Sequence, residues 1–198
     1  MSRPSRRAVP ADPSPFFRPR AFMAALCLCG IALGWSHAAL AAEPAEPGLA
    51  VRYTFADHDN IDPIVERIDT GNPNPGAPVL SLDNRGGEGA KVLTANHGKF
   101  VGAVLTGYLK FPEAGTYQIS ARINDGIRLL IDDKLVLEDK DVAPDRDVGP
   151  ASVTVTEAGW HPIKIYFYQR RGSWRLQVKW SGPGLSGVAP IGPEFLAH

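Results

Sequence analysis

Alternation of apolar and polar positions dominates the chain from Gly48 onward. In Thr116–Ile123 every second side chain is apolar, and the same period of two recurs in Val153–Val155, Ile163–Phe167 and Trp174–Trp180. This period is that of a β-strand with one face in a core and the other in solvent. No long window shows apolar residues at helical spacing, so these segments predict strands.

Clusters of turn-forming residues separate the predicted strands. Gly, Asn and Asp tolerate the backbone angles of tight turns, and Pro ends a strand ladder. Short strands punctuated in this way, with no helices to cover a parallel sheet, predict an all-β fold, an antiparallel β-sandwich or barrel. The segment from Asp69 to Gly89 is rich in the same residues, and we expect it to form a long surface loop. The punctuating clusters are Pro112–Gly115, Asn124–Gly126, Asp132–Asp133, Glu157–Gly159 and Arg170–Gly172.

The N-terminal 41 residues read as an export signal. The uncharged run from Ala21 to Trp35 follows Arg18 and Arg20, and Ala39 and Ala41 have the spacing of a signal-peptidase site. This pattern predicts a signal peptide over residues 1–41, a spacer over 42–47 and one domain over 48–198. An uncleaved membrane anchor is the alternative, because about 20 apolar residues span a bilayer. Either way the domain lies outside the cytoplasm, in the periplasm, at the cell surface or secreted.

Charge excludes one class of partner. Residues 1–41 hold five of the 21 basic side chains and one of the 21 acidic ones, so residues 42–198 carry 16 bases and 20 acids. Nucleic-acid binding depends on clustered Lys and Arg, so we expect no nucleic-acid partner. The histidines have no metal-ligand spacing and accompany no Ser or Cys nucleophile motif, so a zinc site and a catalytic triad are not predicted.

The order of motifs along the domain resembles the PA-fourteen (PA14) family, a β-barrel module found in glycosidases and adhesins. The segments that carry the resemblance span most of residues 48–198. They are Gly48–Tyr53, Gly107–Pro112, Gly115–Tyr117, Asn124–Leu129, Ile131–Asp132, Leu135–Val136, Gly159–Ile163, the strand to Trp180, and Ile191–Pro193. The resemblance implies the family's β-barrel and, from several members, carbohydrate binding.

In the adhesin branch of this family, two adjacent aspartates hold a calcium ion that grips sugar hydroxyls. The matching pair here is Asn124-Asp125, which has lost one carboxylate. The loop expected to complete such a site contains Arg170 and Arg171, whose charges repel a dication. Calcium at Asn124 and Asp125 is therefore the weaker of two hypotheses. The other is a metal-free site in which Arg170 or Arg171 binds an acidic or hydroxyl-rich ligand.

Aromatic side chains are common sugar platforms, because a ring face packs on the apolar face of a pyranose. Tyr166 and Tyr168 alternate with core positions, so we expect them at the surface as ligand-binding candidates. Trp174 and Trp180 share the phase of Leu176 and are expected in the core. An isolated turn is an equally good interpretation of Asn124–Gly126.

These observations favour a non-catalytic, lectin-like module that binds a glycan or a cell-envelope polysaccharide. The alternative is a structural or protein-interaction domain of an envelope assembly, with other envelope proteins as partners and no sugar. An independent glycosidase is not expected, because in this family the catalytic domain is a separate piece that the present length cannot contain.

Overall fold

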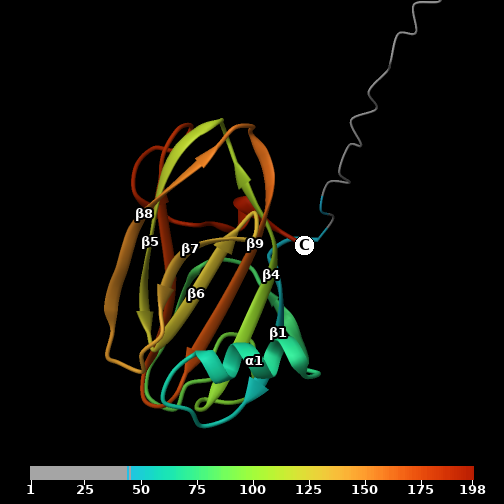
Figure 1. Ribbon diagram of the computed structural model, residues 1–198, viewed down its shortest axis with the longest axis vertical. Coiled ribbons are helices and arrows are strands. Elements are labelled where there is room, and N and C mark those ends of the chain that lie inside the picture. The colour runs from blue at the N-terminus through green and yellow to red at the C-terminus, as the bar shows by residue number, and fades with distance from the viewer. Residues whose placement is uncertain (1–43, 45) are drawn as a thin grey trace, which may run out of the picture. The chain divides into compact units, whose positions relative to one another are not determined.

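The computed structural model describes residue 44 and residues 46–198, which form an all-β domain of two antiparallel sheets with one α-helix (Figure 1). This confirms the predicted fold class. The predicted signal peptide, its cleavage site and part of the spacer lie outside the described residues. Within the described part of the chain, no helix is long and apolar enough to cross a membrane.

The larger sheet has seven strands. Six of them follow the order β2-β1-β4-β9-β6-β7, and a short C-terminal strand, β12, pairs with one part of β4. All of these pairings are antiparallel. The strands are β1 (Leu49–Phe55), β2 (Asn74–Val79), β4 (Val101–Phe111), β6 (Gly126–Ile131), β7 (Lys134–Asp139), β9 (Gly159–Gln169) and β12 (Leu196–Ala197).

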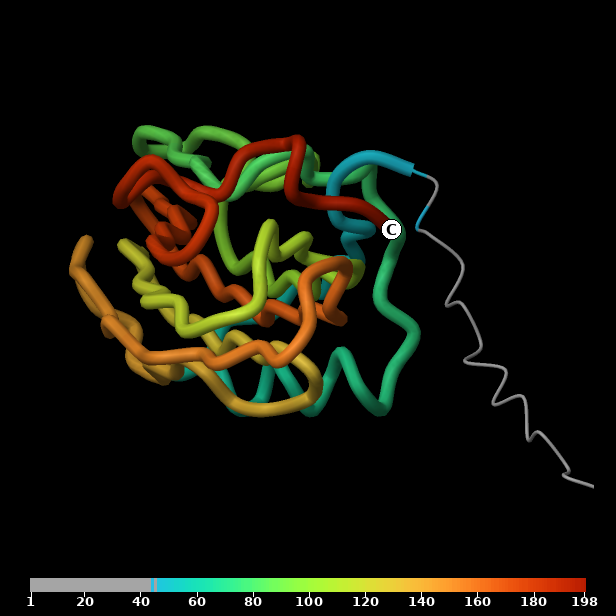
Figure 2. The backbone as a smooth tube through the Cα atoms, turned by 90° about the horizontal axis from the view of Figure 1, so that it is seen from above, coloured from blue at the N-terminus to red at the C-terminus, as the bar shows by residue number. Residues whose placement is uncertain are grey.

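The smaller sheet has five strands, in the order β11-β10-β5-β8, with β3 on β10 beside β11. Viewed from the end, the backbone of both sheets runs around a common centre (Figure 2), which side chains from both sheets fill. The strands are β3 (Asp83–Gly86), β5 (Gly115–Asn124), β8 (Arg146–Val155), β10 (Trp174–Ser181) and β11 (Ala189–Pro190), and a 3₁₀ turn, η1 (Pro193–Phe195), precedes β12.

The core is built from the alternate positions that the sequence indicated. In β10, Trp174, Leu176, Val178 and Trp180 are buried, while the residues between them are partly exposed. Trp180 stacks on Tyr117 of β5 with ring centroids 5.7 Å apart. The predicted core role of both tryptophans is confirmed, and the buried apolar area of this face supplies the main stabilisation of the sandwich.

A helix that the sequence analysis did not anticipate covers part of the outer face of the larger sheet. Helix α1 (Asp62–Thr70) begins with Asp62-Pro63 and buries Ile64 and Ile68, which lie one turn apart on one face. Figure 1 shows α1 lying across the strands of this sheet, and these two isoleucines pack in a cluster with Val104, Tyr166 and Tyr168.

This helix overturns the expectation that two tyrosines are surface platforms. Tyr166 is 5% exposed and Tyr168 is fully buried. Their side chains do point away from the main core, as the alternation predicted, but α1 and the segment before it cover them. The Tyr166 hydroxyl donates to Asp69 over 2.6 Å, and the Tyr168 hydroxyl donates to backbone oxygens of Ala56 and His58.

The segment from Asp69 to Gly89 is not the long loop that its composition predicted. It contains β2 and β3, which extend one sheet each as outer strands, and Val79 and Leu82 within it are buried. Proline is tolerated in such strands because an outer strand leaves some amides unpaired. The placement of β3 on β10 brings this segment to the candidate site.

The two ends of the described domain are paired. Backbone hydrogen bonds join Glu46 and His198 in both directions, at 2.8 and 3.1 Å, and Figure 1 shows the C-terminus beside the start of the described chain. Glu46 and His198 therefore lie side by side.

Candidate functional site

A polar hollow of about 370 Å³ lies where β3, β10 and β5 run side by side. We call it the Asn124 hollow. The strand registers explain its composition, because Arg175 of β10 stands between Arg85 of β3 and Asn124 of β5, and Trp174 stands opposite Gly86. Its lining residues are Arg85, Gly86, Gly87, Asn124, Asp145, Ser173, Trp174 and Arg175.

The two residues of the predicted Asn124-Asp125 pair have different positions. They are joined by a cis peptide bond. The Asn124 amide lines the hollow and makes no hydrogen bond to any described residue. Asp125 is 4% exposed, and its Oδ2 accepts a hydrogen bond from the backbone amide of Arg170 over 2.7 Å. Burial raises the pKa of Asp125, and the Arg170 amide opposes that shift.

Gln169, the last residue of β9, makes hydrogen bonds to the loop that follows this strand. This side chain is fully buried, and its Nε2 donates to the backbone oxygens of Arg171 and Ser173 at 2.8 and 3.2 Å. Together with the Asp125 bond, these contacts fix Ser173 and the start of β10 at the mouth of the Asn124 hollow.

Arg170 and Arg171, predicted as ligand-binding residues, direct their guanidinium groups to acids outside the hollow. Arg170 Nε and Arg171 Nη2 reach the two carboxylate oxygens of Asp57 at 2.7 and 2.8 Å, and Arg170 Nη1 reaches Asp59 at 2.8 Å. The Arg170 hydrogen bond, together with Arg171, holds the pKa of Asp57 below its usual value. Both cations are therefore already compensated by carboxylates, which the sequence analysis did not anticipate.

Trp174 also lines the Asn124 hollow, but it is 6% exposed and belongs to the core. Its N–H is buried and has no hydrogen-bond partner among the described residues. Gly86 lies against this nitrogen so closely that a Cβ at that position would overlap it. The absence of a side chain at Gly86 is what lets β3 lie over the indole.

Charged side chains form the walls. Arg175 Nη1 lies 3.3 Å from Asp145 Oδ2, and the same oxygen lies 3.2 Å from Arg122 Nε. Arg122 also approaches Asp147 at 3.8 Å. Arg85 is exposed and has no ion pair or side-chain hydrogen bond with any described residue. One carboxylate in the hollow thus faces two arginines.

The donors around Asn124 and Asp125 do not fit the calcium site that the resemblance implied. Ca²⁺ takes six to eight oxygen ligands. One Asp125 oxygen is committed to the Arg170 amide, and the carbonyls of Arg171 and Ser173 already accept from Gln169. Among the described residues, no three His, Cys, Asp or Glu side chains gather in a group that could hold a metal ion.

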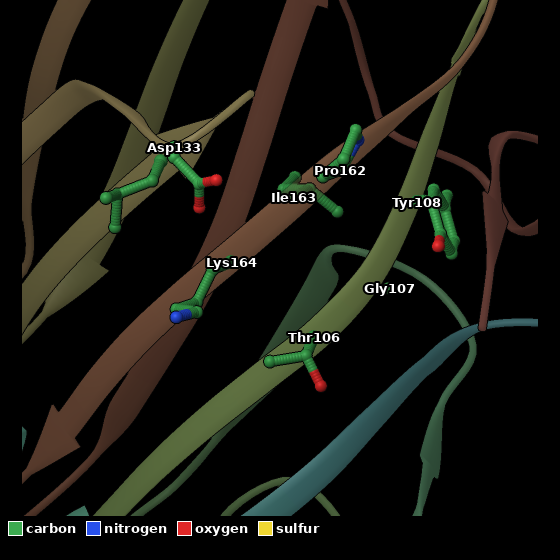
Figure 3. A pocket seen from close by; sticks show the side chains of 8 residues that line it. Thr106, Gly107, Tyr108, Asp133, Pro162, Ile163 and Lys164 are labelled. Carbon is green, nitrogen blue, oxygen red and sulfur yellow. The ribbon is translucent and has the colours of Figure 1, made fainter. Parts of the chain in front are cut away.

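A second hollow, of about 220 Å³, lies beside β4, β6 and β9 of the larger sheet (Figure 3). We call it the Tyr108 hollow. Figure 3 shows Thr106 and Tyr108 on β4, Lys164 on β9 and Asp133 in the turn after β6 around it. Tyr108 is 37% exposed. This hollow is smaller than the Asn124 hollow and has none of the residues predicted for ligand binding.

Of the six predicted ligand residues, Asn124 lines the hollow. Asp125 and Arg170 do not line it, but the hydrogen bond from the Arg170 backbone amide to the Asp125 carboxylate positions the loop beside it. Sequence reasoning missed Arg85, Asp145, Ser173 and Arg175. The available signal for Arg175 was its polar position between Trp174 and Leu176 in the alternating run. Arg85 carried no signal, because its position depends on the pairing of β3 with β10.

Comparison with sequence families gives one match, to the PA14 domain, over residues 91–191. These residues run from the segment before β4 to the segment after β11, and they include Asn124, Asp145 and Arg175. A search of curated protein sequences found no match.

Solved structures with the same fold include two PA14 domains and one adhesin domain. The PA14 domain of the MpAFP antifreeze protein is 21% identical with a TM-score of 0.64, and the match covers 79% of this chain and 94% of that one. The PA14 sugar-binding domain from an RTX adhesin is 19% identical with a TM-score of 0.65, covering 78% and 99%. The epithelial adhesin 6 A domain from Candida glabrata, in complex with Galβ1-3GlcNAc, is 12% identical with a TM-score of 0.59, covering 80% and 90%.

Proposed function

This chain belongs to the PA14 domain family, and on that basis we propose that it is a non-catalytic carbohydrate-binding module that works outside the cytoplasm. We place its ligand site at the Asn124 hollow. The solved sugar-binding domain of the RTX adhesin and the Candida glabrata adhesin bound to Galβ1-3GlcNAc support this proposal, since both have the fold described above.

The observation that carries the proposal is the composition of the Asn124 hollow. Sugars present hydroxyl groups at their rim and apolar C–H groups on their ring faces, so their sites combine fixed polar groups with an aromatic surface. The hollow has the unpaired amide of Asn124, the hydroxyl of Ser173 and the charges of Arg85, Arg175 and Asp145, and Trp174 is also among its lining residues.

The same composition argues for binding without catalysis. Glycoside hydrolysis typically uses two carboxyl groups on either side of the scissile bond. Asp145 is the one carboxylate among the described residues that line the Asn124 hollow, and it lies in ion pairs with Arg175 and Arg122. The proposal includes no metal, because the pair has a single carboxylate and one oxygen of that carboxylate accepts from the Arg170 amide.

The location and partners follow from the N-terminal sequence. A signal peptide over residues 1–41, or an uncleaved anchor, would place the domain in the periplasm, at the cell surface or in the medium. The glycan partners available there include cell-envelope polysaccharides. An assembly role with envelope proteins as partners is the outcome to expect if no sugar binds.

A glycan array tests the proposal. We expect the full-length chain to give saturable binding to a subset of glycans, and Asn124→Ala to abolish it without changing the melting temperature, because the Asn124 amide bonds to no described residue. Asn74→Ala, in exposed strand β2, is the matched control and should bind as the parent does. Absence of saturable binding to any glycan would refute the proposal and favour an assembly role.

A further inference from the structure

The arginines of the Asn124 hollow point to the chemical class of its ligand. We propose that the ligand is an acidic glycan, and that the carboxylate of a uronic acid residue binds between Arg85 and Arg175. This inference rests on the proposed function and narrows it.

Arg85 and Arg175 occupy directly opposite positions in the antiparallel pair of β3 and β10. Side chains at such positions are within about 5.5 Å of each other at Cβ, and like charges placed there repel. Nothing in the fold requires this pairing, since both side chains lie on the polar face and neither fills the core. An anion between the two guanidinium groups would convert the repulsion into two attractive contacts.

The protein's own carboxylates do not balance the positive charges of Arg85, Arg175 and the neighbouring Arg122. Asp145 Oδ2 is shared between Arg175 and Arg122, and Asp147 approaches Arg122 alone, at 3.8 Å. Three guanidinium groups therefore face two carboxylates, and Arg85 pairs with neither. The contrast with Arg170 and Arg171 is clear, because those two are matched by Asp57 and Asp59.

The shape of the hollow suits a planar anion attached to a sugar ring. Gly87 also lines the hollow, and a Cβ there would meet nothing within 4 Å, so the space at this residue is open. Guanidinium groups bind carboxylates through paired N–H donors. With the carboxylate held there, the Asn124 amide and the Ser173 hydroxyl are the groups that remain for ring hydroxyls.

Binding of uronate polymers to the full-length chain tests this inference. The probes are polygalacturonate, alginate and hyaluronate, each compared with its carboxyl-reduced, neutral counterpart. We expect at least one acidic polymer to bind about tenfold or more tightly than its neutral counterpart, the effect of one or two charge-assisted hydrogen bonds.

Four substitutions, one of them a control, locate the effect. Arg85→Gln and Arg175→Gln should each weaken binding of that polymer about tenfold and remove its advantage over the neutral form. Arg67→Gln, at an exposed arginine on α1, removes the same charge elsewhere and should change nothing. Asp145→Asn should have the opposite effect and tighten binding of the acidic polymer, because it removes the negative charge that pairs with Arg175 within the protein. A melting temperature for each variant confirms folding.

The outcomes separate this inference from the proposed function. Equal binding of acidic and neutral polymers, or a preference for acid that survives Arg85→Gln and Arg175→Gln, would overturn the uronate assignment and leave glycan binding intact. No binding of these polymers or of any array glycan would overturn both.

Discussion

The buried carboxylate of Asp125 accepts a hydrogen bond from the backbone amide of Arg170 over 2.7 Å, and this contact joins the end of β5 to the loop that leads into β10. Asp125 is 4% exposed and is not among the residues that line the Asn124 hollow. Its role is to position Ser173 and the start of β10 relative to Asn124.

Two substitutions at Asp125 should separate the contribution of its hydrogen-bond acceptor to stability from the contribution of its negative charge. Asp125→Ala leaves the Arg170 amide unpaired in a buried place and should cost about 1–3 kcal/mol of unfolding free energy. Asp125→Asn keeps an acceptor oxygen and should cost less. Chemical denaturation at pH 7 measures both, and an equal loss for the two variants would contradict the positioning role.

The pH dependence of the parent follows from the same carboxyl. Burial raises the pKa of Asp125 in the folded state, so the folded form binds the proton more tightly than the unfolded chain does. The resulting stabilisation is present below the unfolded value, about 3.9, and is lost as the pH rises through the folded value. Asp125→Asn should abolish this loss, which melting curves of parent and variant across that interval would reveal.

Calcium should have no effect on the chain at the Asn124-Asp125 pair. One oxygen of Asp125 accepts from the Arg170 amide, and Asp125 contributes the sole carboxylate of the pair. We expect titration with Ca²⁺ to give no saturable heat that depends on Asp125, and glycan binding to be the same in Ca²⁺ and in EDTA. Heat in the range of ordinary calcium modules that disappears in Asp125→Asn would show that the donor set is more complete than the contacts indicate.

Tyr166 should contribute to stability and not to sugar binding. Its hydroxyl donates to Asp69 over 2.6 Å, which anchors the C-terminal turn of α1 on the larger sheet. Tyr166→Phe removes this one bond and should cost about 1 kcal/mol, with glycan affinity unchanged. Loss of glycan binding in a variant that melts normally would restore the tyrosine as a ligand platform.

Two adjacent glycines provide a matched pair. A Cβ at Gly86 would overlap the indole nitrogen of Trp174, whereas a Cβ at Gly87 would meet nothing within 4 Å. Gly86→Ala should therefore push β3 away from β10, lowering stability by about 1–3 kcal/mol as overpacked sites do and weakening ligand binding. Gly87→Ala should preserve stability, and similar stability of the two variants would show that the close approach of Gly86 to Trp174 is unimportant.

The fold could be predicted from sequence because its information is local. Alternation in Thr116–Ile123 and Trp174–Trp180 places the correct side chains in the core, and the residues between strands set the turns. Helix α1 was missed because nine residues with two buried isoleucines give a weak periodic signal. This short helix changes the candidate site, because it covers the two tyrosines that the alternation of apolar and polar residues had placed at the surface.

The candidate site could be predicted only in part, because it depends on pairing between distant strands. Asn124 was found through its turn motif. Arg85 lies about 90 residues from Arg175 in sequence, and they meet because β3 joins the smaller sheet in one particular register. Likewise, the sequence could not show that Arg170 and Arg171 form ion pairs, because Asp57 is far from them in the chain and meets them in the folded domain.

The central claim is that glycan binds at the Asn124 hollow, and hydrogen–deuterium exchange of the full-length chain with and without a bound glycan tests it most directly. We expect protection of backbone amides in β3 and at Asn124, Ser173 and Arg175, with no change at Tyr108 or Lys164. Protection centred on the Tyr108 hollow of Figure 3 instead, with β3 unchanged, would contradict the account.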